Sequence, residues 1–280
     1  MHKIINLSKK VLIIFVLAYF IFCLTVYFKQ EWFFYNPTNE ASDIEFARHN
    51  NYPAERVDYK SADGTDLFAW YTKPKAGKKV IVFMHGNSYN IEKFYIKLIP
   101  LQQAGYGTFL PEYRGFGGIA GKIAQKNLTA DAIAAIEYLH KEGYKNEDIV
   151  VYGMSLGSHM ATNSVYTLGQ DNQFAGLILE VPFTTLVDVA RAHVPFPLPF
   201  DYIMRDKYDN ISKITHIHTP LLIMGAGRDA TVPVNLAKEL YAHAKQPKKL
   251  IIYEDGGHSN LYDFKNYQDI LSWLKANEKN

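Results

Sequence analysis

The fold of this chain is decided by one stretch, Gly153-Met154-Ser155-Leu156-Gly157. It follows an apolar run at 148–152 that predicts a buried strand, and it precedes residues 158–167, which predict a helix. A serine on a sharp strand-to-helix turn holds its hydroxyl above the edge of the sheet. Its neighbours two positions away must be small for the chain to pass, and glycine at both positions meets that demand. The pattern predicts a nucleophile elbow with Ser155 as the nucleophile.

Two further residues follow Ser155 in the order that a serine nucleophile needs. Such a serine requires a base to take its proton and an acid to orient that base. Asp229 comes just after one predicted apolar strand, and His258 comes just after another. Because the carboxyl ends of parallel strands meet at one edge of a sheet, we expect Ser155, Asp229 and His258 to lie together there. Glu180, at the end of a further predicted strand, is the alternative acid.

The strand predicted at 79–84 ends in His85-Gly86-Asn87. A tetrahedral intermediate at Ser155 carries an oxyanion, which preorganised N–H donors must stabilise. We expect one donor to be the backbone N–H of Leu156, the residue after the nucleophile, and the other to be the backbone N–H of Asn87. For His85, next to the glycine of this turn, we expect a structural role.

These motifs together resemble those of the α/β-hydrolase superfamily, and they occur in its order from about Val57 onward. Within it the chain is similar to small membrane-anchored α/β-hydrolase-domain proteins, some of which remove fatty acyl chains from protein cysteines. The resemblance implies an α/β fold with a mostly parallel central sheet flanked by helices. The motifs are His85-Gly86-Asn87, Tyr113-Arg114-Gly115-Phe116-Gly117, Gly153-Met154-Ser155-Leu156-Gly157, Gly225-Ala226-Gly227-Arg228-Asp229 with Val232-Pro233, and Gly257-His258.

The chemistry predicted from these residues is hydrolysis of a carboxylic ester or thioester of an apolar acyl substrate through an acyl-serine intermediate. It requires no cofactor and no metal. A peptidase, an acyltransferase or a membrane-lipid lipase could use the same triad, and a non-enzymatic membrane-tethered binding protein could keep the fold. After Phe116-Gly117 the chain continues Gly118-Ile119-Ala120-Gly121 where the family usually has a small-polar Ser-x-Gly segment, so the resemblance transfers substrate preference weakly.

Composition excludes other classes of partner and site. The net charge is +2, and no basic run is interleaved with aromatic residues, so we expect no nucleic-acid partner. The single cysteine, Cys23, lies near the N-terminus, which leaves the rest of the chain without a disulfide or a cysteine metal cluster. His216 and His218 would share one face of a strand, but no third metal ligand lies near them in the sequence.

An uncharged apolar run at 11–28 predicts a membrane anchor. As a helix it would extend about 27 Å, close to the thickness of a bilayer's hydrocarbon core. Lysines at positions 3, 9 and 10 precede it, which predicts a single-pass protein with a cytoplasmic N-terminus and the enzyme on the outer (periplasmic, lumenal or extracellular) side. A cleaved signal peptide is the alternative, although bulky residues follow the run. The aromatic residues 32–35 would form an interfacial belt or pack on the enzyme.

The predicted domains are an anchor with a short cytoplasmic tail at 1–30, a juxtamembrane linker at 31–50 and a catalytic domain at 51–280. A small cap is predicted at about 181–219. In the cap, Phe196, Leu198 and Phe200 alternate with prolines, which prevent regular structure. They would form an acyl-binding wall, or a rigid crossover whose aromatic side chains pack on the core.

Elsewhere, hydrophobic periodicity predicts alternating strands and helices. Residues 56–60 and 66–72 predict an antiparallel pair of strands. Residues 91–104 and 129–142 predict helices, and Thr129 is a suitable N-cap for the second.

Overall fold

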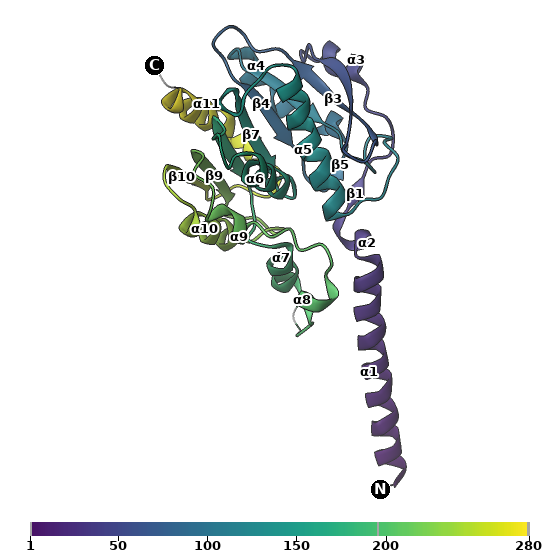
Figure 1. Ribbon diagram of the computed structural model, residues 1–280. Helices are drawn as coiled ribbons and strands as arrows, with labels where there is room; N and C mark the ends of the chain where they lie inside the picture. The colour runs from purple at the N-terminus through teal and green to yellow at the C-terminus, as the bar shows by residue number, and fades with distance from the viewer. Residues whose placement is uncertain (1, 195, 279–280) are drawn as a thin grey trace.

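An eight-stranded sheet forms the centre of the protein, of which the computed structural model describes residues 2–194 and 196–278 (Figure 1). The strands lie in the order β10-β9-β8-β7-β4-β6-β3-β2; the β2–β3 and β3–β6 pairs are antiparallel and the others are parallel. The predicted α/β fold class with a mostly parallel sheet is confirmed. The strands are β2 (Glu55–Lys60), β3 (Asp66–Thr72), β4 (Val80–Met84), β6 (Gly107–Pro111), β7 (Ile149–Met154), β8 (Gly176–Glu180), β9 (Leu221–Ala226) and β10 (Lys248–Tyr253).

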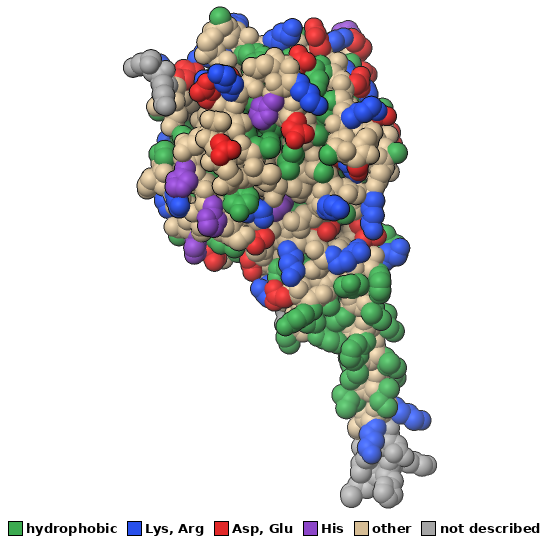
Figure 2. Space-filling view, viewed as in Figure 1, with side chains coloured by type: hydrophobic (Ala, Val, Ile, Leu, Met, Phe, Trp, Pro, Cys, Tyr) green, Lys and Arg blue, Asp and Glu red, His purple; other side chains and the backbone are tan. Residues whose placement is uncertain are grey.

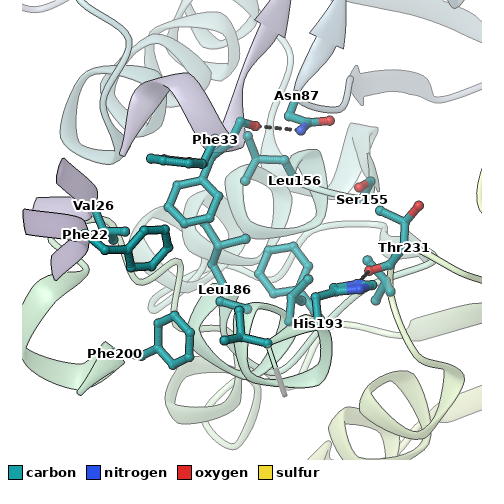
Figure 3. Close-up of a pocket in the computed structure, with 16 residues that line it drawn as sticks. Phe22, Val26, Phe33, Asn87, Ser155, Leu156, Leu186, His193, Phe200 and Thr231 are labelled. Atoms are coloured by element: carbon teal, nitrogen blue, oxygen red, sulfur yellow. Dashed lines mark hydrogen bonds between the residues drawn. The ribbon is translucent and has the colours of Figure 1, made fainter. Parts of the chain in front are cut away.

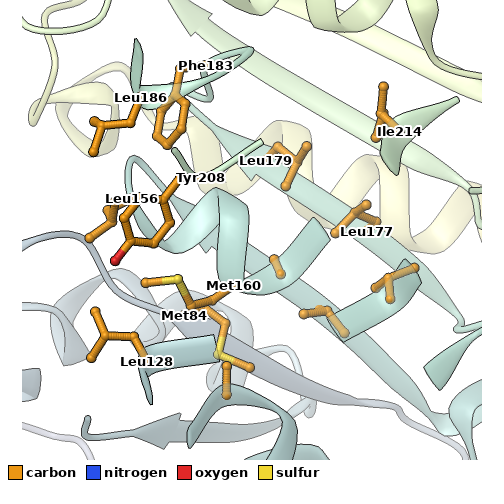
Figure 4. Packing of buried hydrophobic residues seen from close by; sticks show 14 of the residues in the cluster. Met84, Leu128, Leu156, Met160, Leu177, Leu179, Phe183, Leu186, Tyr208 and Ile214 are labelled. Carbon is orange, nitrogen blue, oxygen red and sulfur yellow. The ribbon is translucent and has the colours of Figure 1, made fainter. Parts of the chain in front are cut away.

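Helices cover both faces of this sheet, so strands β4, β7, β8 and β9 are buried along their whole length. Each face has its own hydrophobic cluster, and Figure 4 shows part of the larger one, to which Met160 and Leu177 both belong. One face is covered by α5 (Gln125–Lys141), α6 (Gly157–Leu168) and α10 (Val234–His243), and the other by α4 (Ile99–Gln103) and α11 (Asn266–Asn277).

Two predicted helices differ from the structure. Residues 91–104 form two 3₁₀ turns, η1 (Ile91–Lys93) and η2 (Tyr95–Lys97), before α4 begins. Pro100 lies in the first turn of α4; inside a longer helix its ring would clash with the carbonyl of Ile96. Thr129 is not an N-cap, because α5 begins four residues earlier. The Thr129 hydroxyl instead donates to the carbonyl of Gln125 at 2.7 Å.

The N-terminal part of the chain begins with α1 (His2–Lys29), which projects from the body of the protein in Figure 1. Residues 8–29 of this helix are long and apolar enough to cross a membrane. Residues 31–50 are folded onto the sheet domain. They form α2 (Glu31–Phe34), β1 (Asn36–Pro37), which pairs with β5 (Ser88–Tyr89), and α3 (Ile44–His49).

The aromatic residues 32–35 divide between the two roles considered for them. Trp32 and Phe33 are exposed, whereas Tyr35 is buried. Its hydroxyl contacts the hydroxyl of Tyr208 and the carboxylate of Asp206. The side chain of Gln30 accepts hydrogen bonds from the backbone N–H groups of Arg205 and Asp206. The residues directly after α1 are therefore attached to the segment at 205–208 within the cap.

The cap contains three short helices, α7 (Leu186–His193), α8 (Phe200–Ile203) and α9 (Ile211–Ile214). In Figure 1, α7 and α8 lie beyond the carboxyl edge of the sheet, on the side from which α1 projects, and α8 contacts α1. His216 and His218 follow α9 in a turn and a loop rather than in a strand, which corrects the expected placement.

His159 on α6 connects the cap to the sheet domain. Its Nδ1–H donates to the side-chain oxygen of Asn210 at 3.0 Å, and its Nε2 lies 3.3 Å from the side-chain amide nitrogen of Gln125. The Gln125 side-chain oxygen in turn accepts from the backbone N–H groups of Lys207 and Tyr208. Burial, reinforced by the nearby charge of Lys213, lowers the pKa of His159 to about 3.

We expect replacement of His159 by Gln to flatten the pH dependence of stability. In the unfolded chain this histidine binds a proton below about pH 6.5, whereas in the folded protein it stays neutral down to about pH 3. Its stabilising contribution is complete above pH 6.5 and declines as the pH falls. Between pH 7 and pH 5 the loss is about 2 kcal/mol in the free energy of unfolding. Urea unfolding in detergent micelles at both pH values measures it, and equal losses for the wild type and the Gln variant would contradict it.

Candidate active site

Ser155 lies on the turn between β7 and α6 with a backbone φ of 52°. Non-glycine residues rarely adopt this left-handed region, so the turn must be held by its surroundings. A Cβ on Gly157 would lie 2.0 Å from the carbonyl oxygen of Met84, and one on Gly153 would lie 2.3 Å from the carbonyl oxygen of Gly157. The two glycines therefore permit the close packing of the turn against β4.

The three residues predicted as a triad come together at the carboxyl edge of the sheet. His258 Nε2 lies 2.9 Å from Ser155 Oγ, and His258 Nδ1 lies 2.8 Å from Asp229 Oδ2. The Asp229 carboxylate is 1% exposed, and its other oxygen accepts hydrogen bonds from the backbone N–H groups of Thr231 and Val232. The arrangement forms one hydrogen-bonded chain from a buried carboxylate to the hydroxyl of Ser155.

The alternative acid, Glu180, has other partners. Its buried carboxylate accepts from the Lys97 ammonium at 2.8 Å and also contacts the Tyr152 hydroxyl and the Asn266 amide. Its backbone carbonyl accepts from the N–H of Ser155 at 2.9 Å. Glu180 therefore supports the elbow through its main chain, while its side chain belongs to a buried ion pair beneath the sheet edge.

The two expected oxyanion donors are the backbone N–H groups of Leu156 and Asn87. Leu156 occupies the N-cap position of α6, where a backbone N–H has no partner within the helix. Gly86 brings the β4 loop against the nucleophile, since a Cβ built on it would lie 3.6 Å from the Ser155 Cβ. Asn87 and Leu156 both line the cavity next to Ser155.

Asn87 also connects this loop to the segment that follows the N-terminal helix α1. Its side-chain amide donates to the carbonyl of Phe34 at 2.6 Å, and its own carbonyl accepts from the N–H of Asn36 at 3.0 Å. His85, the neighbouring residue, is fully buried, and its ring stacks on Phe94.

An apolar cavity of about 310 Å³ leads from Ser155 to α1, and we call it the α1 cavity. Figure 3 shows Phe22 and Val26 of α1 at one end and Ser155 at the other. The described lining residues are Phe22, Val26, Phe33, Phe34, Asn87, Ser155, Leu156, Phe183, Leu186, Val189, Ala190, His193, Val194, Phe200, Thr231 and Val232.

The cap contributes to this cavity differently from what its sequence predicted. Phe200 lines the α1 cavity, but Phe196 and Leu198 lie outside its lining. Phe196 is 50% exposed, and Leu198 is half-buried against the larger hydrophobic cluster. Phe22 and Val26, which sequence reasoning missed, instead complete the wall. Their only signal in the sequence is a spacing of four residues. In a helix that is apolar all round, this spacing does not distinguish one face from another.

A second cavity of about 500 Å³ opens on the other side of Ser155. Its lining includes His258, Tyr262, Asp263 and Lys93, so it is more polar than the α1 cavity. Among residues 2–194 and 196–278, no group of three or more His, Cys, Asp or Glu side chains is placed to hold a metal ion. Ser155 thus lies at the junction of an apolar cavity and a more polar one.

Comparison with known proteins found a matching family and several relatives. The profile of the prolyl oligopeptidase family matches residues 92–280. An uncharacterized protein of Mycobacterium tuberculosis is 34% identical over 215 residues, which cover 74% of each chain. The lysophosphatidylserine lipase ABHD12 of Macaca fascicularis is 30% identical over 223 residues, 72% of this chain and 54% of that one.

Solved structures show the same fold. The Pyrococcus furiosus esterase Pf2001 superposes with a TM-score of 0.68 at 20% identity, over 87% of this chain and all of that one. The resemblance to the α/β-hydrolase superfamily is confirmed by these comparisons. The chain belongs to the prolyl oligopeptidase family and has the α/β-hydrolase fold.

Proposed function

We propose that this hydrolase cleaves carboxylic ester or thioester bonds of apolar acyl substrates, with Ser155 as nucleophile, His258 as base and Asp229 as the orienting acid. The observation that carries the proposal is the continuous hydrogen-bonded chain of these three side chains, which ends at the α1 cavity. A largely apolar pocket with a few convergent polar groups is typical of sites for small apolar ligands.

In the proposed reaction, the Ser155 oxygen attacks the carbonyl carbon while His258 Nε2 takes the hydroxyl proton. The tetrahedral intermediate collapses as the bond to the leaving oxygen or sulfur breaks, and His258 returns its proton to that atom. Water then attacks the acyl-serine with His258 again as the base, which releases the carboxylic acid and restores the serine. Asp229 keeps the proton on Nδ1 and stabilises the charged imidazole.

The charge that develops on the carbonyl oxygen would be held by the backbone N–H groups of Leu156 and Asn87. Preorganised donors in a site that excludes water stabilise such charge more than water does. The α1 cavity would take the acyl chain, and the more polar second cavity would take the alcohol or thiol part.

The names of relatives support an acyl ester as the substrate class. One relative is called a lysophosphatidylserine lipase, and a solved structure of the same fold is called an esterase. The family is named for an oligopeptidase, so peptides are the second class to be tried. We further propose that 1–30 is a membrane anchor with a cytoplasmic N-terminus, since Lys9 and Lys10 precede the apolar stretch of α1.

Replacement of Ser155 by Ala should abolish turnover of p-nitrophenyl esters and leave the fold intact. A fluorophosphonate probe should label the wild type covalently and should not label the variant, because it needs the serine oxygen. Esters, thioesters and peptides assayed in parallel identify the bond that is cleaved. The mechanism is excluded if the variant keeps its activity while its circular dichroism spectrum is unchanged.

Replacement of Asp229 by Asn should lower kcat by about 10⁴-fold, because the amide favours the wrong tautomer of His258. Glu180→Gln is the matched control for the alternative acid. Its effect should be a loss of stability from the broken Lys97 pair, seen by thermal unfolding. A larger loss of kcat in the Glu180 variant than in the Asp229 variant would reverse the assignment.

Replacement of Val26 by Trp should shorten the acyl chain that the enzyme accepts, because Val26 lines the α1 cavity. The ratio of kcat/KM for p-nitrophenyl palmitate to that for p-nitrophenyl butyrate should fall roughly tenfold or more. Leu24→Trp is the control, since Leu24 is 55% exposed on the same helix. Equal ratios in the two variants would mean that the acyl chain binds elsewhere.

A further inference from the structure

The cap reaches far down the side of α1. The Tyr19 hydroxyl donates to the backbone carbonyl of Pro197 at 3.4 Å. Tyr19 precedes Lys29, the last residue of α1, by ten positions, which places this contact roughly 15 Å along the helix axis from its end. We call residues 196–198 the cap tip.

This contact constrains where a membrane can lie. If the cap tip stayed outside the bilayer, only residues 11–18 of the apolar stretch would remain to cross it. Eight helical residues extend roughly 12 Å, whereas the hydrocarbon core is about 30 Å thick. A membrane-spanning α1 therefore requires the cap tip to lie inside the bilayer, close to the middle of the apolar stretch.

The surface chemistry of this end of the molecule fits such a position. Figure 2 shows hydrophobic side chains along α1 and on the adjoining lower end of the body, with charged side chains above them and basic side chains near the far end of α1. Phe196 is 50% exposed at the cap tip. Transfer of the exposed half of a phenylalanine side chain from water into hydrocarbon is favourable.

Two arginines near the cap have acidic partners. Arg191 on α7 forms an ion pair with Asp201 on α8. Arg205 lies 3.8 Å from the carboxylate of Glu31 and stacks over the ring of Tyr27, which places it at the level of the end of α1. Arginine at this level can extend its guanidinium to the membrane interface.

The α1 cavity lies between these two surfaces. Phe22 and Val26 of α1 form one side, and Leu186 and Phe200 of the cap form the other (Figure 3). Phe22 is seven positions before Lys29, so this end of the cavity lies roughly 10 Å along α1 from its end. At that depth the neighbouring phase is hydrocarbon rather than water.

We propose that the cap tip is immersed in the leaflet on the enzyme's side of the membrane, and that the acyl chain of a membrane-resident lipid ester passes from the bilayer between α1 and the cap to Ser155. The second part rests on the proposed function. The substrate class is then an acyl ester that is dissolved in the membrane, and α1 is a wall of its binding site as well as an anchor.

A spin label on the cap tip tests the immersion without any assay of activity. The full-length protein carries Cys23→Ala with Phe196→Cys, and is reconstituted in phosphatidylcholine vesicles. Lys238→Cys on the exposed face of α10 is the matched control. The label at 196 should collide with oxygen and be shielded from a water-soluble nickel chelate, and the control should show the opposite. Equal access of the nickel chelate to both labels overturns the immersion.

A paired activity assay tests the route of the acyl chain. We compare hydrolysis of a monoacylglycerol in phosphatidylcholine vesicles with hydrolysis of water-soluble p-nitrophenyl acetate. Phe196→Asp should lower the ratio of the two rates at least tenfold, because a carboxylate disfavours immersion, and Phe196→Leu should leave the ratio within about twofold. An unchanged ratio in the Asp variant overturns the route. A wild type without Ser155-dependent hydrolysis of either ester overturns the proposed function instead, and the spin-label result still decides the immersion.

Discussion

The strained turn at Ser155 is the constraint on which the rest of the site depends. Its φ of 52° exists because the chain passes directly from β7 into α6 against the carbonyl groups that end β4. The turn projects the serine hydroxyl beyond the sheet and places the N–H of Leu156 beside it. Backbone strain of this kind persists only where the surroundings over-determine it, and here both neighbouring strands do so.

The N-terminal segment is part of the same constraint. The Phe34 carbonyl, at the end of α2, accepts from the Asn87 side chain, so the segment that follows α1 is bonded to the loop that we propose for the oxyanion. Gln30 binds the backbone of Arg205 and Asp206 within the cap, and the Tyr35 hydroxyl contacts that of Tyr208. Movement of α1 relative to the sheet would therefore disturb the loop, the cap and the α1 cavity together. An anchor attached through a flexible tether would lack this coupling.

Sequence reasoning placed the sheet and the three side chains of the site well, because their signals are local. Glycines two positions from Ser155, short apolar runs and turn residues after them each reflect a steric demand within a few residues. The predicted helix bounds were wrong where a single residue overrides the hydrophobic periodicity. Pro100 divides a predicted helix, and Gln125 rather than Thr129 begins another.

The positions of the cap side chains could not be predicted from the sequence in this way. The spacing of Phe196, Leu198 and Phe200 gave all three the same expected role, yet Phe200 lines the α1 cavity while Phe196 points away from the core. Irregular backbone has no fixed period that assigns side chains to faces. Only the path of the chain through space decides which of them is covered.

The sequence by itself indicated Ser155, His258 and Asp229 as the residues that we propose as nucleophile, base and acid, since chemistry and local sterics restrict the residues that each position accepts. The tertiary structure alone decided that Phe22 and Val26 of an apolar helix belong to the site, and that the cap extends along that helix as far as Tyr19. In a uniformly apolar helix every face is equally able to meet lipid or protein, so only the packed neighbours distinguish them.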